Sequence, residues 1–209
     1  MKTALQKNLE FSEKYHQKNL GETEIPKMIN YLIPDAKNII DLGCGDGALI
    51  SAVNKRFPNK KIIGVDISPR RINLLKERFP SQKFVCTDIC NTNLKDESFN
   101  MVVSTQVIEH VEDDKKMIDE INRLLKSGGH LYVTSVIKKP WAVYKFRNKG
   151  KFVLDPTHER EYRNKEEFLN LFRNNFRLIK TLIYPVYREK FHLTIKIPGY
   201  YIIEGLWIK

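Results

Sequence analysis

Residues 39–47 constrain the fold of this chain more than any other segment. They read Ile-Ile-Asp-Leu-Gly-Cys-Gly-Asp-Gly, and a helix-like segment, Ala48–Arg56, follows them. The apolar residues predict a buried strand, and the glycines predict a turn whose main chain a ligand can approach closely. Glycine amides before a helix would hold a phosphate. Asp41, however, places a carboxylate at the end of the strand, which favours a cationic or hydroxyl-bearing ligand.

Short apolar runs alternate with helix-like segments from residue 38 onward. This alternation predicts an α/β fold in which a largely parallel sheet has helices on both faces. The expected strands are Asn38–Leu42, Lys61–Asp66, Lys83–Thr87, Phe99–Ser104, His130–Ser135, Arg177–Tyr184 and Tyr200–Ile208. The expected helices are Ala48–Phe57, Pro69–Phe79, Asp113–Leu125 ahead of Gly128-Gly129, and Glu166–Asn174, with further helix at residues 3–20 and Ile25–Leu32 forming an N-terminal cap.

The overall composition fits a globular protein without a membrane anchor. Of the 209 residues, 42% are apolar, which is enough to bury a core, and no run of about 18 apolar residues is present. The N-terminus lacks the apolar stretch of a signal peptide. Cys44, Cys86 and Cys90 form neither a disulfide framework nor a zinc-ligand pattern. We therefore expect a cytoplasmic protein with no metal site.

Positive charge is concentrated in the last third of the chain. Residues 1–137 hold 20 Lys+Arg against 18 Asp+Glu, whereas residues 138–209 hold 16 against 7. Such an excess favours an anionic partner, such as an acidic substrate, a membrane surface or a nucleic acid, although it also serves solubility alone. Cations alternate with aromatic residues over Lys138–Lys151, which is compatible with peripheral membrane contact or with an exposed loop.

Polar side chains stand where four successive strands should end. Asp41, Asp66 and Asp88 follow the first three strands, and Thr105-Gln106 follow the fourth. Because ligands of open α/β sheets bind beyond the carboxyl ends of the strands, we expect these positions to converge on one crevice. Asp66 lies about 20 residues past the glycine turn, where a carboxylate can hold ribose hydroxyls.

A dinucleotide-dependent dehydrogenase is the alternative for this loop. Gly43, Gly45 and Ala48 satisfy the loose G-x-G-x-x-A fingerprint, and Asp66 fits its acidic residue. A carboxylate at Asp41 would face the pyrophosphate unfavourably, however. Gly47 and the later strand-end motifs would also go unexplained, so this alternative is the weaker one.

These motifs together resemble those of class I S-adenosylmethionine-dependent methyltransferases of the small-molecule type, similar to those of ubiquinone biosynthesis. The resemblance covers about residues 39–136. Its segments are 41–47 (DLGCGDG), 64–68 (GVDIS), 87–89 (TDI), 102–111 (VVSTQVIEHV) and 124–131 (LLKSGGHL). It implies a Rossmann-like three-layer sandwich with a seven-stranded, mostly parallel sheet, an antiparallel last strand and an N-terminal helical cap.

The resemblance also implies a cofactor and a binding site. The cofactor would be S-adenosyl-L-methionine, leaving S-adenosyl-L-homocysteine as the product. Asp41 would face the methionine ammonium, and Asp66 would bind the ribose hydroxyls. The remaining contacts implied are Gly43, Cys44 and Gly45 along the methionine and ribose, Ile67 on the adenine, Asp88 and the Ile89 amide at the adenine edge, and Thr105 with Gln106 under the methionine end.

We expect a single domain over residues 1–209. Residues 1–36 would form the helical cap, residues 37–137 the cofactor-binding core, and residues 138–209 the substrate side and the final strands. In the resembled family the N-terminal segment often folds over the cofactor, so Tyr15 and His16 are candidates for closing the site or for simple packing.

Two histidines are candidates for a general base. His110 lies in the turn after the fourth strand, where a helix-start hydrogen bond explains it equally well. His158 follows Asp155-Pro156-Thr157 in the region where the resembled family often gathers substrate residues, with Glu161 and Tyr162 near it. An oxygen nucleophile gains from such a base, and histidine titrates near neutral pH.

The expected function is transfer of a methyl group to a small organic acceptor, most simply at an oxygen. The acceptor could be anionic or lipid-linked, because the C-terminal third is basic. Two alternatives stay open: a non-catalytic cofactor-binding protein and an RNA methyltransferase. Intact cofactor residues argue against the first. A nucleic-acid partner is not favoured either, because Ser104-Thr105-Gln106-Val107 replaces the Asn-Pro-Pro-Tyr-like motif and no paired catalytic cysteines are present. The sequence does not indicate the oligomeric state.

Overall fold

The structure is a computed structural model that describes residues 3–14, 23–142, 146–148, 151–153, 155–190 and 193–209. Tyr15 and His16 lie outside the described residues, and so does part of the basic, aromatic run Lys138–Lys151. No helix in the described part of the chain combines the length and the apolar character needed to cross a membrane.

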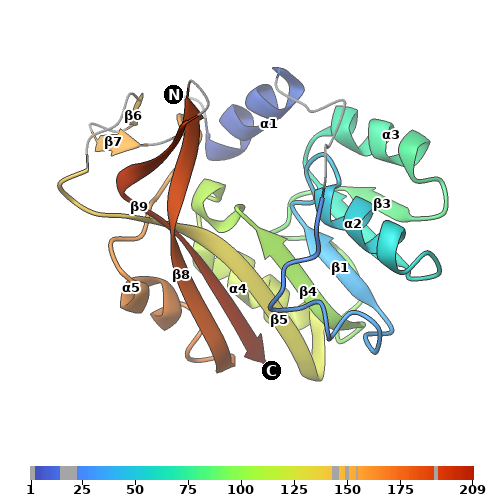
Figure 1. Ribbon diagram of the computed structural model, residues 1–209. Coiled ribbons are helices and arrows are strands. Elements are labelled where there is room, and N and C mark those ends of the chain that lie inside the picture. The colour runs from blue at the N-terminus through green and yellow to red at the C-terminus, as the bar shows by residue number, and fades with distance from the viewer. Residues whose placement is uncertain (1–2, 15–22, 143–145, 149–150, 154, 191–192) are drawn as a thin grey trace.

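The seven-stranded sheet has the predicted class of topology (Figure 1). Its strand order is β3-β2-β1-β4-β5-β9-β8, in which the first five strands are parallel and β9 is antiparallel to both β5 and β8. The bounds are β1 Ile39–Leu42, β2 Ile62–Asp66, β3 Lys83–Cys86, β4 Phe99–Thr105, β5 Leu125–Lys138, β8 Arg177–Lys190 and β9 Leu193–Ile208. A separate hairpin pairs β6 (Phe146–Asn148) with β7 (Lys151–Val153).

Helices cover both faces of the sheet and so complete three layers. Met117 of α4 (Asp114–Leu124) and Phe168 of α5 (Lys165–Asn170) belong to one buried cluster. Ile50 of α2 (Ala48–Arg56) and Leu75 of α3 (Pro69–Arg78) belong to the other. Successive residues of β1 contribute to opposite clusters, since Ile39 packs with α2 and Ile40 with α4, as the alternation of a strand requires.

The predicted helix at Ile25–Leu32 is wrong. Residues 27–35 form consecutive turns instead. The amides of Ile29 and Leu32 bond to carbonyls three residues back, whereas those of Asn30 and Ala36 bond four residues back, so the bonds do not continue as one α-helical ladder. Met28, Ile29 and Ile33 still bury their side chains under the sheet, so the segment keeps its apolar role without its expected backbone.

Several other boundaries differ from the prediction, since β8 continues to Lys190 instead of ending at Tyr184 and β9 begins at Leu193 instead of Tyr200. Strand β5 begins at Leu125, directly after α4, because Leu125 already pairs with Phe99 of β4 before a register shift. The strand therefore contains Gly128-Gly129, which were expected to follow the helix. The last predicted helix is shorter than expected, since α5 ends at Asn170 and turns follow through residue 175. The amides of Leu171 and Phe172 bond three residues back there, which tightens the chain.

Helix α1 (Ala4–Lys14) stands at one end of the sheet, beside α3, rather than on either face (Figure 1). Glu13 at its C-terminal end accepts a hydrogen bond from the Ser68 hydroxyl at 2.7 Å. Near its start, Lys7 contacts Glu159 at 2.9 Å. Helix α1 therefore extends from the N-terminus of α3 to the loop that precedes α5.

Candidate active site

One cavity of about 360 Å³ lies beyond the carboxyl ends of the parallel strands. It is lined by the turn after β1, the ends of β2 and β4, the segment after β3, helix α1 and residues of the 155–157 loop. Eight predicted cofactor residues and one predicted base line it: Gly43, Gly45, Asp66, Ile67, Asp88, Ile89, Thr105, Gln106 and His110. Three of the four predicted strand-end positions, Asp66, Asp88 and Thr105-Gln106, therefore meet at one crevice, whereas Asp41 does not line it.

Asp66 joins the glycine turn to the end of β2. Its Oδ2 accepts the Gly45 amide at 2.9 Å and its Oδ1 accepts the Ser68 amide at 2.9 Å. The residue is 6% exposed, so these bonds are formed away from bulk water. Each carboxylate oxygen has two acceptor sites, which leaves capacity on both oxygens for hydroxyl donors in the cavity.

Gly45 lines the cavity with a backbone that other residues rarely adopt. Its φ is +53°, and a Cβ built on it would meet no atom within 4 Å. Gly43 differs, because its Cβ would lie 2.4 Å from a Val107 methyl group. Glycine at 43 thus serves packing of the turn against the residues after β4, whereas glycine at 45 leaves open space where a ligand can reach the main chain.

Asp41 is buried beneath the turn and does not line the cavity. It is 2% exposed, and burial followed by repulsion from Asp66 raises the pKa of its carboxyl group to about 7. Its Oδ1 has no hydrogen-bond partner among the residues that the structure describes. Burying a carboxylate oxygen without a hydrogen-bond partner costs free energy. A bound cation or a bridging water would supply the missing partner at this position.

The segments after β3 and β4 hold their polar groups in fixed positions. Asp88 Oδ1 accepts the Cys90 amide at 2.9 Å. Gln106 has a φ of +56°, and its Nε2 donates to the Thr134 hydroxyl on β5 at 3.1 Å. A left-handed backbone at a residue other than glycine costs energy, and such positions cluster at functional sites.

Helix α1 supplies a wall of the cavity. Its lining residues share one face of the helix, since they recur at helical spacing: Ala4, Leu5, Asn8, Phe11 and Ser12. The Asn8 side chain also donates to the His110 carbonyl at 2.7 Å. The resemblance implied that the N-terminal segment covers the cofactor, but the residues of α1 that line the cavity were not predicted, although their spacing is that of one helix face.

His110 stands on the wall of the cavity, on the 3₁₀ helix η1 (Ile108–His110). Its Nδ1 lies 3.0 Å from the Thr157 hydroxyl. Burial, followed by repulsion from His158, lowers the pKa of the imidazole from 6.5 to about 4. The ring is therefore neutral at physiological pH, with a nitrogen lone pair available to accept a proton or a hydrogen bond.

His158 does not line the cavity. It is 5% exposed, and its Nδ1 lies 2.7 Å from Glu161 Oε1. Its ring stands edge-on to that of His110, with the centroids 4.8 Å apart. The two predicted bases are thus neighbours, but of the two it is His110 whose side chain reaches the cavity.

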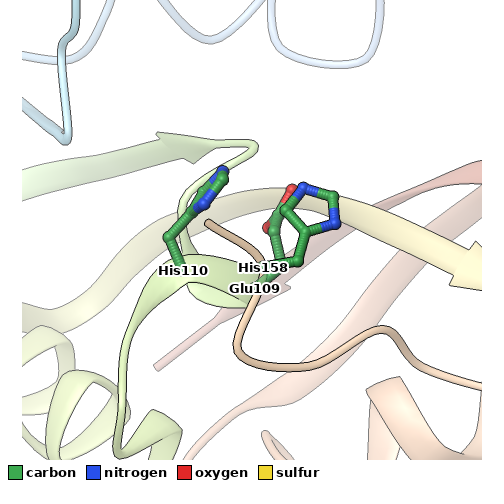
Figure 2. A group of neighbouring side chains, drawn as sticks. All are labelled: Glu109, His110 and His158. Atoms are coloured by element: carbon green, nitrogen blue, oxygen red, sulfur yellow. The ribbon is translucent and has the colours of Figure 1, made fainter. Parts of the chain in front are cut away.

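Glu109 completes this group of side chains (Figure 2). Donor atoms of Glu109, His110 and His158 lie within 4.8 Å of one another, a spacing that a metal ion could bridge. Glu109 is fully buried, and burial raises the pKa of its carboxyl group to about 7, while its Oε2 accepts the Ser135 hydroxyl at 2.9 Å. The expectation that the protein has no metal site stays a prediction.

Cys44 is the remaining predicted cofactor residue. Its side chain is buried among the apolar residues near α2, and its amide bonds to the Val65 carbonyl at 2.9 Å. Any contact with a ligand would therefore come from its main chain. The cavity residues that the sequence analysis missed beyond α1 are Arg71, Cys90, Val107, Val111, Glu112, Asp155 and Thr157.

Residues 40–133 match the protein family described as "Methyltransferase domain". The chain is 28% identical over 115 residues to a mitochondrial ubiquinone biosynthesis O-methyltransferase from Dictyostelium discoideum, covering 48% of this chain and 36% of that protein. It is 26% identical over 147 residues to malonyl-[acyl-carrier protein] O-methyltransferase 1 from Ilyobacter polytropus, covering 68% of this chain and 53% of that protein. The chain thus spans between about a third and about half of these relatives.

Solved structures match the fold over a longer stretch. Geranyl diphosphate C-methyltransferase from Streptomyces coelicolor, in complex with Mg²⁺, geranyl diphosphate and S-adenosyl-L-homocysteine, superposes with a TM-score of 0.69 at 12% identity and covers 99% of this chain and 98% of that one. A methyltransferase from Methanosarcina mazei superposes with a TM-score of 0.66 at 18% identity, covering 87% and 98%. At these identities the likeness establishes the fold alone.

Proposed function

We propose that this protein transfers a methyl group from S-adenosylmethionine to an oxygen of a small organic acceptor, because residues 40–133 match the family described as "Methyltransferase domain" and carry the motifs that resemble class I S-adenosylmethionine-dependent methyltransferases. The observation that carries the proposal is the cavity itself. This space of about 360 Å³ lies at the ends of four parallel strands. The Asp66 carboxylate and the open side of Gly45 both face it.

The residues present fit this cofactor. It carries an ammonium group, a ribose and an adenine, and it has no phosphate. Asp66 and Asp88 line the cavity with carboxylates, and the buried Asp41 Oδ1 lacks a partner among the described residues. Asp66 also fits a dinucleotide, but a pyrophosphate at the turn would meet the Asp41 carboxylate unfavourably, so the donor set supports the methyltransferase over the dinucleotide-dependent dehydrogenase.

Each strand end has a separate part in holding the cofactor. Asp66 would accept from the ribose hydroxyls, and the main chain at Gly43–Gly45 would hold the ribose and the methionine. Asp88 and the Ile89 amide would bond to the adenine edge, with Ile67 against the adenine. Thr105 and Gln106 would contact the methionine end, and Asp41 would balance the ammonium charge from beneath the turn.

Alignment is the main catalytic contribution expected of the chain. The bound cofactor supplies a methyl group on a positively charged sulfur, and the thioether that leaves is neutral. Helix α1 closes one side of the cavity with Phe11 and so limits water around the reacting atoms. His110, neutral near pH 7, accepts the proton of the acceptor hydroxyl as the new bond to carbon forms.

The charges near His110 favour a neutral acceptor. Glu112 and Asp155 line the cavity on that side, and the cation in the described lining, Arg71, has its Nε 3.4 Å from Asp46 Oδ1. Carboxylates around the acceptor position would repel an acidic substrate. A hydroxyl-bearing acceptor without a negative charge therefore fits this wall better than the acidic acceptor considered from net charge alone.

A labelled-transfer assay tests the proposal. The protein is incubated with S-adenosylmethionine carrying a radioactive methyl group and with separate panels of phenols, alcohols, carboxylic acids, amines and bulk RNA. We expect label in the phenols or alcohols and S-adenosylhomocysteine as the product. Tight cofactor binding with no transfer to any panel would instead support a non-catalytic binding protein. Label in RNA, with retention on filters that falls steeply with salt, would support an RNA methyltransferase.

A further inference from the structure

Three residues of the cavity wall form a hydrogen-bonded chain. Asp155, Thr157 and His110 all line the cavity. Asp155 Oδ1 accepts the Thr157 hydroxyl at 2.5 Å and the Thr157 amide at 2.8 Å. The same hydroxyl oxygen lies 3.0 Å from His110 Nδ1. A carboxylate, a hydroxyl and an imidazole are therefore linked in sequence, and the imidazole is at the end of the chain.

The single proton of the threonine hydroxyl decides the direction of this chain. An ionised carboxylate only accepts hydrogen bonds, so at 2.5 Å the Thr157 hydroxyl donates its proton to Asp155. The oxygen then faces His110 with a lone pair. The 3.0 Å contact is a hydrogen bond only if His110 Nδ1 carries a proton and donates it.

A neutral imidazole carries one proton, and its position determines which nitrogen can act as a base. With the proton on Nδ1, the lone pair is on Nε2. Thr157 occupies Nδ1, so Nε2 is the ring nitrogen left for a group in the cavity. The reverse tautomer would place a proton on Nε2 and would leave the ring unable to accept there.

The loop that carries Asp155 and Thr157 is fixed against the helix that carries His110. The amides of Glu159 and Arg160 both donate to the Glu109 carbonyl, at 2.9 and 3.2 Å. Further along, Tyr162 forms a parallel bridge with Ile137 at the end of β5. The relative positions of the three side chains are therefore set by backbone bonds as well as by their own contacts.

His158 provides a matched comparison within the same protein. Its Nδ1 also faces an acceptor, Glu161 Oε1, at 2.7 Å, but its side chain does not line the cavity. A change at Thr157 removes nothing from that contact. The state of the His158 ring thus reports whether a variant has disturbed the loop as a whole.

We propose that Asp155 and Thr157 are positioning residues that hold His110 as its Nδ1–H tautomer and keep Nε2 unprotonated. This proposal rests on the proposed function. In the transfer, the acceptor oxygen would bond to the methyl carbon, and the sulfur would keep the electron pair of the carbon–sulfur bond that breaks. Nε2 of His110 would receive the proton that the acceptor hydroxyl loses. Asp155 and Thr157 exchange no proton with the acceptor, because their role is to orient the ring.

Long-range ¹H–¹⁵N NMR of histidine-labelled protein at pH 7 tests the tautomer directly and needs no acceptor. The His110 and His158 signals are assigned with His110→Gln and His158→Gln. We expect the wild type and Thr157→Ser to show His110 as the Nδ1–H tautomer. Thr157→Val, which removes the acceptor, and Asp155→Ala, which lets the threonine hydroxyl donate to Nδ1, should both move the proton to Nε2. The His158 signal should be the same in Thr157→Ser, Thr157→Val and Asp155→Ala as in the wild type.

Two NMR results would overturn the proposal: an Nε2–H tautomer in the wild type, or an unchanged His110 signal in Thr157→Val. Titration with S-adenosylhomocysteine separates this outcome from failure of the proposed function, since the four proteins should bind it alike if the site is intact.

Once an acceptor is identified, Thr157→Val should lower kcat on the order of 100-fold at unchanged KM for the cofactor, and Thr157→Ser should restore it. Equal kcat values in the two variants would contradict the role.

Discussion

Asp66 Oδ2 accepts the Gly45 amide at 2.9 Å, and this bond joins the end of β2 to the glycine turn after β1. The two residues are 21 positions apart in the chain but share one wall of the cavity. The carboxylate therefore has two functions in this account: it holds the turn in place, and it offers its remaining lone pairs to the ribose hydroxyls of the cofactor.

Removing the Asp66 carboxylate should weaken cofactor binding. We expect Asp66→Ala to lose about 1–3 kcal/mol of binding free energy for S-adenosylhomocysteine, because hydrogen bonds formed away from water are lost and the turn is released. Isothermal titration calorimetry measures the change. Asp96→Ala is the matched control, since Asp96 is an exposed carboxylate bound to Arg123 outside the cavity. Equal losses in both variants would refute the assignment.

Gly45 and Gly128 allow the effect of a methyl group to be separated from backbone strain. Both have a positive φ, of +53° and +75°, and a Cβ at either would meet no atom within 4 Å. Gly45→Ala and Gly128→Ala should each cost about 1 kcal/mol of folding stability. Only Gly45→Ala should also reduce affinity for S-adenosylhomocysteine, by at least about tenfold, because its methyl group enters the cavity. Unchanged affinity would mean that no ligand approaches this turn.

Ionisation of Asp41 should make stability fall as pH rises. Its carboxyl pKa is about 7 in the folded protein against an ordinary value of 3.8, so between these values the folded protein holds a proton that the unfolded chain has released. Unfolding free energy therefore decreases with pH over this window. Urea denaturation measures the unfolding free energy of Asp41→Asn and of the wild type at pH 5 and at pH 8. The difference, variant minus wild type, should be about 1–4 kcal/mol larger at pH 8 than at pH 5. Parallel pH dependences would contradict the buried carboxyl.

Helix α1 should slow the release of the cofactor. Lys7→Ala and Glu13→Ala remove the side-chain contacts with Glu159 and Ser68 at the two ends of the helix. We expect each variant to raise the dissociation rate of S-adenosylhomocysteine roughly twofold to fivefold, because each part-buried contact is worth about 0.5–1 kcal/mol. Surface plasmon resonance measures the rate. Lys55→Ala, at an exposed position near the end of α2, should leave it unchanged.

The strand-and-helix core and its strand-end residues were predictable because both follow local rules. Short segments of the sequence suffice to predict the buried strands, the glycine turn and the polar residue at the end of each of four strands. Parallel strands then bring their carboxyl ends to one edge of the sheet. This logic placed Asp66, Asp88 and Gln106 correctly around a cavity that the structure then showed. The class of the sheet was predictable for the same reason, and its antiparallel strand was implied by the family resemblance.

The acceptor side was not predictable, because it depends on contacts between distant segments. Asn8 bonds to the His110 carbonyl across 102 positions, and Thr157 meets the His110 ring across 47. The sequence drew attention to His158, whereas the preceding Thr157 is the residue that reaches the cavity. A one-residue difference in a loop depends on how that loop packs, which no periodic pattern encodes.

The expectations that stay predictions include the single-domain organisation, the cytoplasmic location and the contact of the basic C-terminal third with a membrane. Trp141 and Tyr187 are 65% and 55% exposed in that third, which is compatible with such contact. Sedimentation with anionic and neutral vesicles would measure it directly.

Calorimetric titration of the wild-type protein with S-adenosylhomocysteine tests the central claim most directly. The account predicts saturable binding of one ligand per chain, competed by S-adenosylmethionine and weakened in Asp66→Ala. Absence of saturable heat up to about 1 mM ligand, which corresponds to a binding free energy weaker than about −4 kcal/mol, would contradict a cofactor site at the glycine turn.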